Sequence, residues 1–86
     1  MSRDTTRAEV LDAIRELARR KLDWNGPVEP SMRLVEDLKL DSIRLLTLAM
    51  EVEDRFRIRL DEDDEAGIRT VDDLVSLILE KRAPDL

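Results

Sequence analysis

The segment "LKLDSIRLLTLAMEVEDRF", residues 38–56, has the pattern of an amphipathic helix preceded by a capping residue. At about 100° per residue, its apolar side chains gather in one stripe, which predicts a face in the protein core. This stripe consists of Leu45, Leu48, Ala49, Val52 and Phe56. Asp41 stands at the expected N-cap position, so Ser42 falls in the first turn of a helix predicted to extend from Asp41 to about Phe56.

A second apolar row, formed by Ile43, Leu46 and Met50, lies roughly 100 to 160° around the same helix from the first stripe. Because an amphipathic helix needs only one apolar stripe, this second row has two interpretations. A central helix that touches two neighbouring helices would bury both rows. Alternatively, the row is a contact surface for a partner or for an apolar ligand.

The sequence before this segment predicts a first helix and a long loop. The helix extends from about Thr6 to Leu22, and Thr6 and Glu9 have the spacing of a capping box. From Asp23 to Leu40 the helical pattern is absent, and the turn signal "NGP" interrupts the chain. Because a lone large aromatic residue usually packs against its surroundings, Trp24 is expected to pin this loop.

The sequence after this segment predicts a short helix and a last main helix. Charged residues and Gly67 allow only a short helical turn around Asp63 to Ala66. Thr70, which has Asp73 three positions later, is the expected cap of a helix that extends to about Lys81. No segment alternates convincingly enough to predict a strand.

These elements predict an all-α fold: a small bundle of three main helices plus one short helix, with a long loop between helices one and two. At 86 residues the chain has the size of one domain, expected to span residues 1–86 with a folded core at about 6–82. Its apolar residues are almost all aliphatic, which suits a small helical bundle. We expect a monomer.

The charge and the residue types exclude several classes of function. A net charge of −6 repels the phosphates of nucleic acids and acidic lipids, and it favours protein partners. The N-terminal segment lacks the apolar stretch of a signal peptide, and no run approaches the roughly 20 apolar residues of a membrane span, so a cytoplasmic location is expected. Without His or Cys the chain lacks the usual general base and the best nucleophile, so we do not expect an enzyme.

The acidic run "DEDDE" has a partial likeness to a calcium-binding loop. Asp61, Asp63 and Glu65 stand at positions 1, 3 and 5 of such a loop. However, position 6 is Ala66 rather than Gly, and position 12 is Asp72 rather than Glu. The run therefore predicts a solvated acidic face and no specific metal site.

The Ser42 hydroxyl is the feature of this sequence that points most directly to chemistry. In the first turn of a helix, unpaired backbone amides and the helix dipole favour a negative group, so a phosphodiester on this oxygen would be stabilised. The alternative is that Asp41 or Ser42 only caps the helix, as an arbitrary "DS" pair commonly does.

Three stretches of the chain favour the first interpretation. "LVEDLKLDSI", "LLTLAMEVEDRF" and "RIRLDEDDEAGIRTVDDLVSLI" resemble the acyl carrier protein family, and the likeness extends from about Ala8 to Arg82. The resemblance implies that Ser42 carries 4′-phosphopantetheine, transferred from coenzyme A by a phosphopantetheinyl transferase, and that Asp41 serves as cap and transferase contact. The terminal thiol of the arm would hold an acyl or aminoacyl group as a thioester and present it to acyl-loading and chain-processing enzymes.

The resemblance also implies two surfaces. An apolar groove that shelters an acyl chain would be bordered by Leu46, Ala66 and Ile68. A surface that meets partner enzymes would consist of Ile43, Arg44, Thr47, Met50, Glu51 and Asp54.

The chain departs from the family around Ser42. Lys39 and Leu40 stand where many members have Gly, and Arg44 and Thr47 stand where acidic residues are frequent. These differences favour a specialised fatty acid, polyketide or related biosynthetic pathway over general fatty acid synthesis. The competing hypothesis is an acidic helical interaction module that docks through its second apolar row and carries nothing.

Overall fold

The computed structural model describes residues 6–82, so residues 1–5 and 83–86 of the predicted domain lie outside the described part. Within that part the chain forms four helices: α1 (Arg7–Lys21), α2 (Ser42–Phe56), α3 (Glu62–Ala66) and α4 (Val71–Arg82). Residues 6–82 contain no strand, only an isolated bridge between Arg33 and Thr70. None of the described helices has the length and hydrophobicity to cross a membrane. The predicted all-α fold is confirmed.

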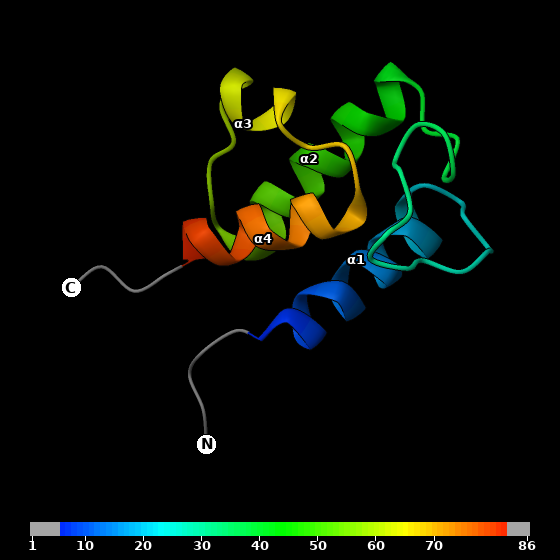
Figure 1. Ribbon diagram of the computed structural model, residues 1–86, viewed down its shortest axis with the longest axis horizontal. Coiled ribbons are helices and arrows are strands. Elements are labelled where there is room, and N and C mark those ends of the chain that lie inside the picture. Colours follow the sequence, from blue (N-terminus) through cyan, green and yellow to red (C-terminus); the bar gives the residue numbers. More distant parts are fainter. Residues whose placement is uncertain (1–5, 83–86) are drawn as a thin grey trace.

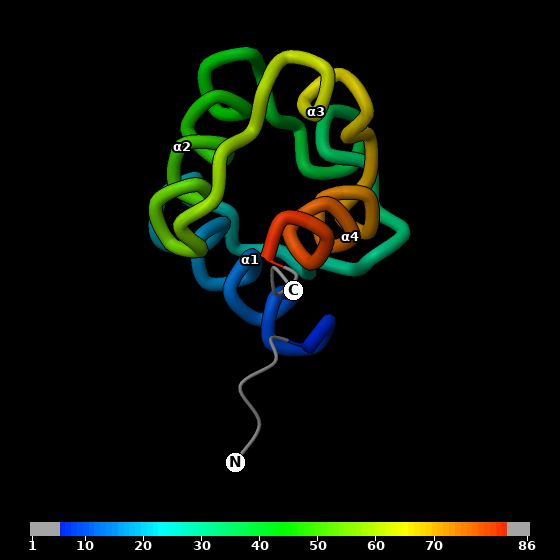
Figure 2. The backbone as a smooth tube through the Cα atoms, turned by 90° about the vertical axis from the view of Figure 1, so that its left-hand side faces the viewer, coloured from blue at the N-terminus to red at the C-terminus, as the bar shows by residue number. Residues whose placement is uncertain are grey.

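Helix α1 packs against both α2 and α4 (Figure 1). In Figure 2, α2 lies on the left of the bundle and α4 on the right. The capping box at its start is confirmed, because the Thr6 hydroxyl accepts a hydrogen bond from the Glu9 amide and the Glu9 carboxylate accepts one from the Thr6 amide. The face of α1 that is buried in the bundle consists of Val10, Ala13, Ile14, Leu17 and Ala18.

The long loop between α1 and α2 is tied to the start of α4. The Val71 amide donates to the Met32 carbonyl at 2.9 Å, and the Asp72 amide donates to the Pro30 carbonyl at 2.9 Å. The first amides of a helix have no acceptor within the helix, so the loop supplies the acceptors that α4 lacks. These bonds hold the loop in the position from which α2 begins.

Thr70 and Asp73 close the same end of α4, as the sequence predicts. The Thr70 hydroxyl accepts from the Asp73 amide at 3.1 Å, and the Asp73 carboxylate accepts from the amides of Thr70 and Arg69, each at 3.0 Å. The bond from the Thr70 amide, followed by the bond from the Arg69 amide, lowers the pKa of Asp73 below its ordinary value.

Trp24 pins the first part of the loop, which confirms its predicted packing role. Its indole nitrogen donates to the Pro27 carbonyl at 3.0 Å, and its ring packs against the hydrophobic core. A Cβ atom at Gly26 would lie 2.8 Å from the Trp24 ring, so only glycine allows the chain to pass this close to the indole.

The predicted core stripe of α2 is only partly buried. Leu48, Val52 and Phe56 are buried, whereas Leu45 and Ala49 are half-buried. Leu45 and Ala49 still pack against the core, as predicted, and they also line a pocket that the neighbouring elements leave open. The stripe therefore packs against the core along its length, and in the first half of α2 it also lines a cavity.

Helix α3 buries none of its residues, and polar contacts hold it in place. Asp61 and Asp64 form a capping box at its start, and the Lys81 ammonium of α4 lies 2.8 Å from the Asp64 carboxylate. The hydrogen bond from Lys81, followed by that from the Asp61 amide, lowers the pKa of Asp64 below its ordinary value. On the other side, the Glu53 carboxylate of α2 accepts from the Leu60 amide at 2.8 Å.

Candidate functional site

Ser42 is the first residue of α2, and its hydroxyl is exposed. The N-cap is Asp41, whose extended backbone and carboxylate allow it to accept from the Arg44 amide at 2.8 Å. Within residues 6–82 no group forms a hydrogen bond with the Ser42 hydroxyl. The capping role therefore belongs to Asp41, and the Ser42 oxygen is free for another use.

The turn that leads into Ser42 contains a residue in an unfavourable backbone conformation. Lys39 has a φ of 58°, in the left-handed region that glycine adopts without cost. Its neighbours Leu38 and Leu40 are both buried, and the Leu40 amide donates to the Leu34 carbonyl at 3.1 Å. Burial of the two leucines on either side holds Lys39 in this conformation, which costs a non-glycine residue about 1–2 kcal/mol.

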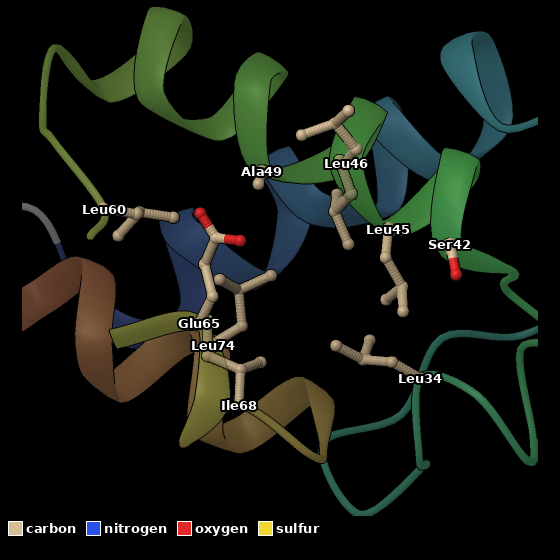
Figure 3. A pocket seen from close by; sticks show the side chains of 10 residues that line it. Leu34, Ser42, Leu45, Leu46, Ala49, Leu60, Glu65, Ile68 and Leu74 are labelled. Atoms are coloured by element: carbon tan, nitrogen blue, oxygen red, sulfur yellow. The ribbon is translucent and has the colours of Figure 1, made fainter. Parts of the chain in front are cut away.

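An apolar pocket of about 440 Å³ opens beside Ser42, which is one of its lining residues. Figure 3 shows Ser42 at one side of this pocket, with Leu60 and Glu65 at the opposite side. The pocket lies between α2, the long loop and the segment from residue 60 to α4. We call it the groove, and its lining consists of Leu34, Ser42, Leu45, Leu46, Leu48, Ala49, Leu60, Glu65, Ile68 and Leu74.

Two of the three residues predicted to border an acyl groove lie in the lining of this pocket. Leu46 and Ile68 line the groove, whereas Ala66 does not. Ala66 is the last residue of the short helix α3 and is exposed, while its neighbour Glu65 supplies the lining. Adjacent helical residues point about 100° apart, so a shift of one position changes which side chain faces the cavity.

The second apolar row of α2 faces outward. Ile43, Leu46 and Met50 are 76%, 56% and 58% exposed, so this row is not buried against a second helix of the same chain. Val35 in the long loop is also exposed, at 54%, although no periodic pattern marks a loop residue in the sequence. Isolated apolar residues on a surface are common, whereas three on one helix face are the pattern expected of a contact surface.

The polar residues predicted on the partner surface have different environments. Arg44 is exposed, and within the described residues its guanidinium forms no ion pair or hydrogen bond. The Thr47 hydroxyl donates to the Ile43 carbonyl at 3.0 Å and is thereby satisfied within its own helix. Glu51 is half-buried, and the exposed Asp54 lines a shallow surface depression together with Met50.

The acidic residues of the "DEDDE" run have structural roles at two positions. Asp61 caps α3, and Asp64 binds Lys81. In the part of the chain that the structure describes, no group of three or more acidic residues is arranged to hold a metal ion.

A free serine hydroxyl at the start of a helix, next to an apolar groove, suits the attachment of an anionic group and the shelter of an apolar ligand, as a small helical carrier requires. Comparison with known families agrees with this class. The chain belongs to the phosphopantetheine attachment site family, whose sequence model matches residues 12–78. Its prosthetic group is therefore 4′-phosphopantetheine, and the resemblance to acyl carrier proteins is confirmed. Members of this family are carriers rather than enzymes.

Curated relatives and a solved structure support the assignment. The meromycolate extension acyl carrier protein of Mycolicibacterium aurum is 37% identical over 60 residues, which cover 67% of this chain and 62% of that protein. The acyl carrier protein of Myxococcus xanthus is 26% identical over 74 residues, covering 85% and 94%. The crystal structure of the acyl carrier protein of Thermotoga maritima superposes with a TM-score of 0.79 at 29% identity, covering 87% of this chain and 88% of that one. The chain thus spans about six tenths of the length of the first of these relatives.

Proposed function

We propose that this chain is an acyl carrier protein whose 4′-phosphopantetheine is attached to Ser42. When attached, the group supplies a terminal thiol that carries an acyl or aminoacyl cargo as a thioester. The observation that carries the proposal is the Ser42 hydroxyl, which is exposed, has no hydrogen bond within residues 6–82 and lies on the rim of an apolar groove.

The start of α2 suits a phosphodiester at Ser42. The first backbone amides of the helix have no acceptor within the helix, and the positive end of the helix dipole lies there. The Asp41 carboxylate accepts a hydrogen bond from the Arg44 amide and so stabilises the start of the helix, while the Ser42 oxygen takes no part in this bond. A transferase would join that oxygen to the phosphopantetheine phosphate of coenzyme A, with its own base removing the hydroxyl proton and adenosine 3′,5′-bisphosphate leaving.

The exposed face of α2 is the proposed docking surface for the transferase and for the acyl-loading and chain-processing enzymes. Ile43 and Met50 provide apolar contacts, and Arg44, Glu51 and Asp54 provide charges that surround them. Because these side chains project from the helix that carries Ser42, a partner bound there would meet the attachment point directly. Thr47 contributes its methyl group, since its hydroxyl is bonded to the Ile43 carbonyl.

The pathway that we propose is a specialised fatty acid pathway or a related polyketide pathway. Its support is the similarity to the meromycolate extension acyl carrier proteins, together with Arg44 beside the attachment point. The groove favours a carrier over an interaction module that carries nothing. A docking module needs the exposed row, whereas an open apolar groove beside Ser42 would serve it no purpose.

The proposal is tested by incubation with coenzyme A and a broad-specificity phosphopantetheinyl transferase, followed by intact mass measurement. The mass is expected to rise by one phosphopantetheine group, and peptide mapping is expected to place it on Ser42. Ser42→Ala should abolish the gain, whereas Ser31→Ala and Ser76→Ala, matched controls at two other serines, should retain it. An unmodified wild-type chain would refute the carrier assignment.

A further inference from the structure

Glu65 is the one charged residue in the lining of the groove, where the other residues are aliphatic except Ser42. Figure 3 shows its side chain extending from α3 into the groove, toward the side where Leu60 and Ala49 lie. Within the described residues its carboxylate forms no hydrogen bond and no ion pair, in contrast to Asp61 and Asp64 of the same segment. Glu65 is exposed, so water hydrates this carboxylate in the empty groove, and the groove presents an acceptor without a protein partner on the side away from Ser42.

The carboxylate changes which cargo the groove can shelter. A plain hydrocarbon chain that fills this side of the groove would remove water from the carboxylate without replacing its hydrogen bonds, which is unfavourable. A chain that carries a hydrogen-bond donor at the same depth would restore a partner, and a bond to a charged acceptor is stronger than one between neutral groups. The aliphatic residues between Ser42 and Glu65 would still contact the intervening methylene groups.

We propose that Glu65 is a specificity-determining residue of the groove, and that the cargo this carrier shelters is an acyl chain with a hydroxyl or ammonium group remote from the thioester. This inference rests on the proposed function, since the cargo reaches the groove from an arm on Ser42. The shared chemistry is a hydrogen-bond donor, and it can come from a hydroxyl or from an ammonium group.

The test uses the phosphopantetheine-bearing full chain loaded with octanoyl, 8-hydroxyoctanoyl or 8-aminooctanoyl groups. Two readouts are the rate of thioester hydrolysis in solvent and the amide chemical shifts of Leu60 and Ile68, which line the groove. In the wild-type chain both donor-bearing cargoes are expected to hydrolyse several-fold more slowly than octanoyl and to shift these amides further.

Two substitutions distinguish the donors. Glu65→Ala should remove the advantage of both donor-bearing cargoes and improve protection of octanoyl. Glu65→Gln keeps a neutral acceptor, so it should retain protection of the hydroxyl cargo and lose that of the ammonium cargo. Glu62→Gln is the matched control, because Glu62 is exposed on the same helix and does not line the groove; it should behave like the wild-type chain.

The outcomes separate this inference from the proposed function. If Ser42 accepts no phosphopantetheine, both are overturned. If all three cargoes load but are protected equally in the wild-type and Glu65→Ala chains, the carboxylate turns to solvent when cargo enters, and only the role of Glu65 is overturned.

Discussion

The Asp41 carboxylate lies 2.8 Å from the backbone nitrogen of Arg44 and closes the N-cap of α2, while the Ser42 hydroxyl between them remains free. These adjacent residues therefore have different roles at the start of α2. One side chain stabilises the helix that presents the other. Asp41 and Ser42 can therefore be tested separately.

Replacement of Asp41 should separate capping from transferase recognition. Asp41→Ala removes the acceptor for the Arg44 amide and should lower the free energy of unfolding by about 1 kcal/mol. Asp41→Asn retains an acceptor, so stability should change by only a few tenths of a kcal/mol. If the charge of Asp41 also contacts the transferase, Asp41→Asn should still slow phosphopantetheine transfer. Denaturant unfolding and transfer rates measure the two effects, and an unaltered rate in Asp41→Asn would limit Asp41 to capping.

Arg57→Gly should stabilise the chain. Arg57 is the C-cap of α2 and has a φ of 56°, a left-handed conformation that glycine adopts without strain. Relief of this strain, less the greater freedom of glycine in the unfolded chain, should add up to about 1 kcal/mol to the free energy of unfolding. Thermal unfolding measures the gain. Arg59→Gly is the control, because Arg59 has no positive φ and glycine there adds only unfolded-state freedom; equal effects of the two substitutions would contradict the explanation.

Stability should fall in acid partly through Asp73. Its pKa in the folded chain lies below the value of about 3.9 expected in an unfolded chain, because the Thr70 and Arg69 amides donate to the carboxylate. The stabilisation is therefore complete above about pH 4 and is lost as the pH falls through the folded pKa. Asp73→Asn should flatten this part of the curve of unfolding free energy against pH. Asp63→Asn, on the exposed surface of α3, should leave it in place; equally steep curves for the wild-type and Asp73→Asn chains would count against Asp73.

Recognition of α2 should depend on its acidic residues. Glu51 and Asp54 lie beyond the attachment point on this helix, and basic partner enzymes would be attracted to them. Reversing both residues to Lys should lower the turnover of the transferase or the loading enzyme without unfolding the chain, and added salt should slow association of the wild-type chain. If neither the charge reversal nor added salt alters these rates, recognition is mainly apolar, through Ile43 and Met50.

Arg44 should select among partner enzymes. An alternative is that Arg44 pairs with a neighbouring acid, but within residues 6–82 its guanidinium has no ion pair. A partner that offers Arg or Lys at this position would be repelled, so Arg44→Asp should improve turnover by general fatty acid enzymes and impair turnover by the dedicated loading enzyme. Parallel assays with both enzyme sets on the Arg44→Asp and wild-type chains measure this. An equal change with both sets would remove Arg44 from partner selection.

The sequence by itself determined the helices and their caps, and it pointed to Ser42 as the proposed attachment point. The Thr6 and Glu9 pair, the Thr70 and Asp73 pair and the Asp41 cap depend on hydrogen bonds between residues three positions apart, so their spacing can be recognised in the chain. The apolar stripe of α2 was recognisable for the same reason, because its 3.6-residue period is a local property.

Only the tertiary structure decided which parts of those helices are covered. Leu45, Leu48 and Ala49 share one periodicity and all line the groove, yet only Leu48 is buried, because α2 and α4 both pack on α1 and leave space between them. The choice of Glu65 rather than Ala66 as a lining residue depends on how Lys81 and Glu53 anchor the segment around α3. Such contacts join residues that are far apart in the chain. The burial of a side chain depends on all of these long-range contacts together, so no local sequence pattern predicts it.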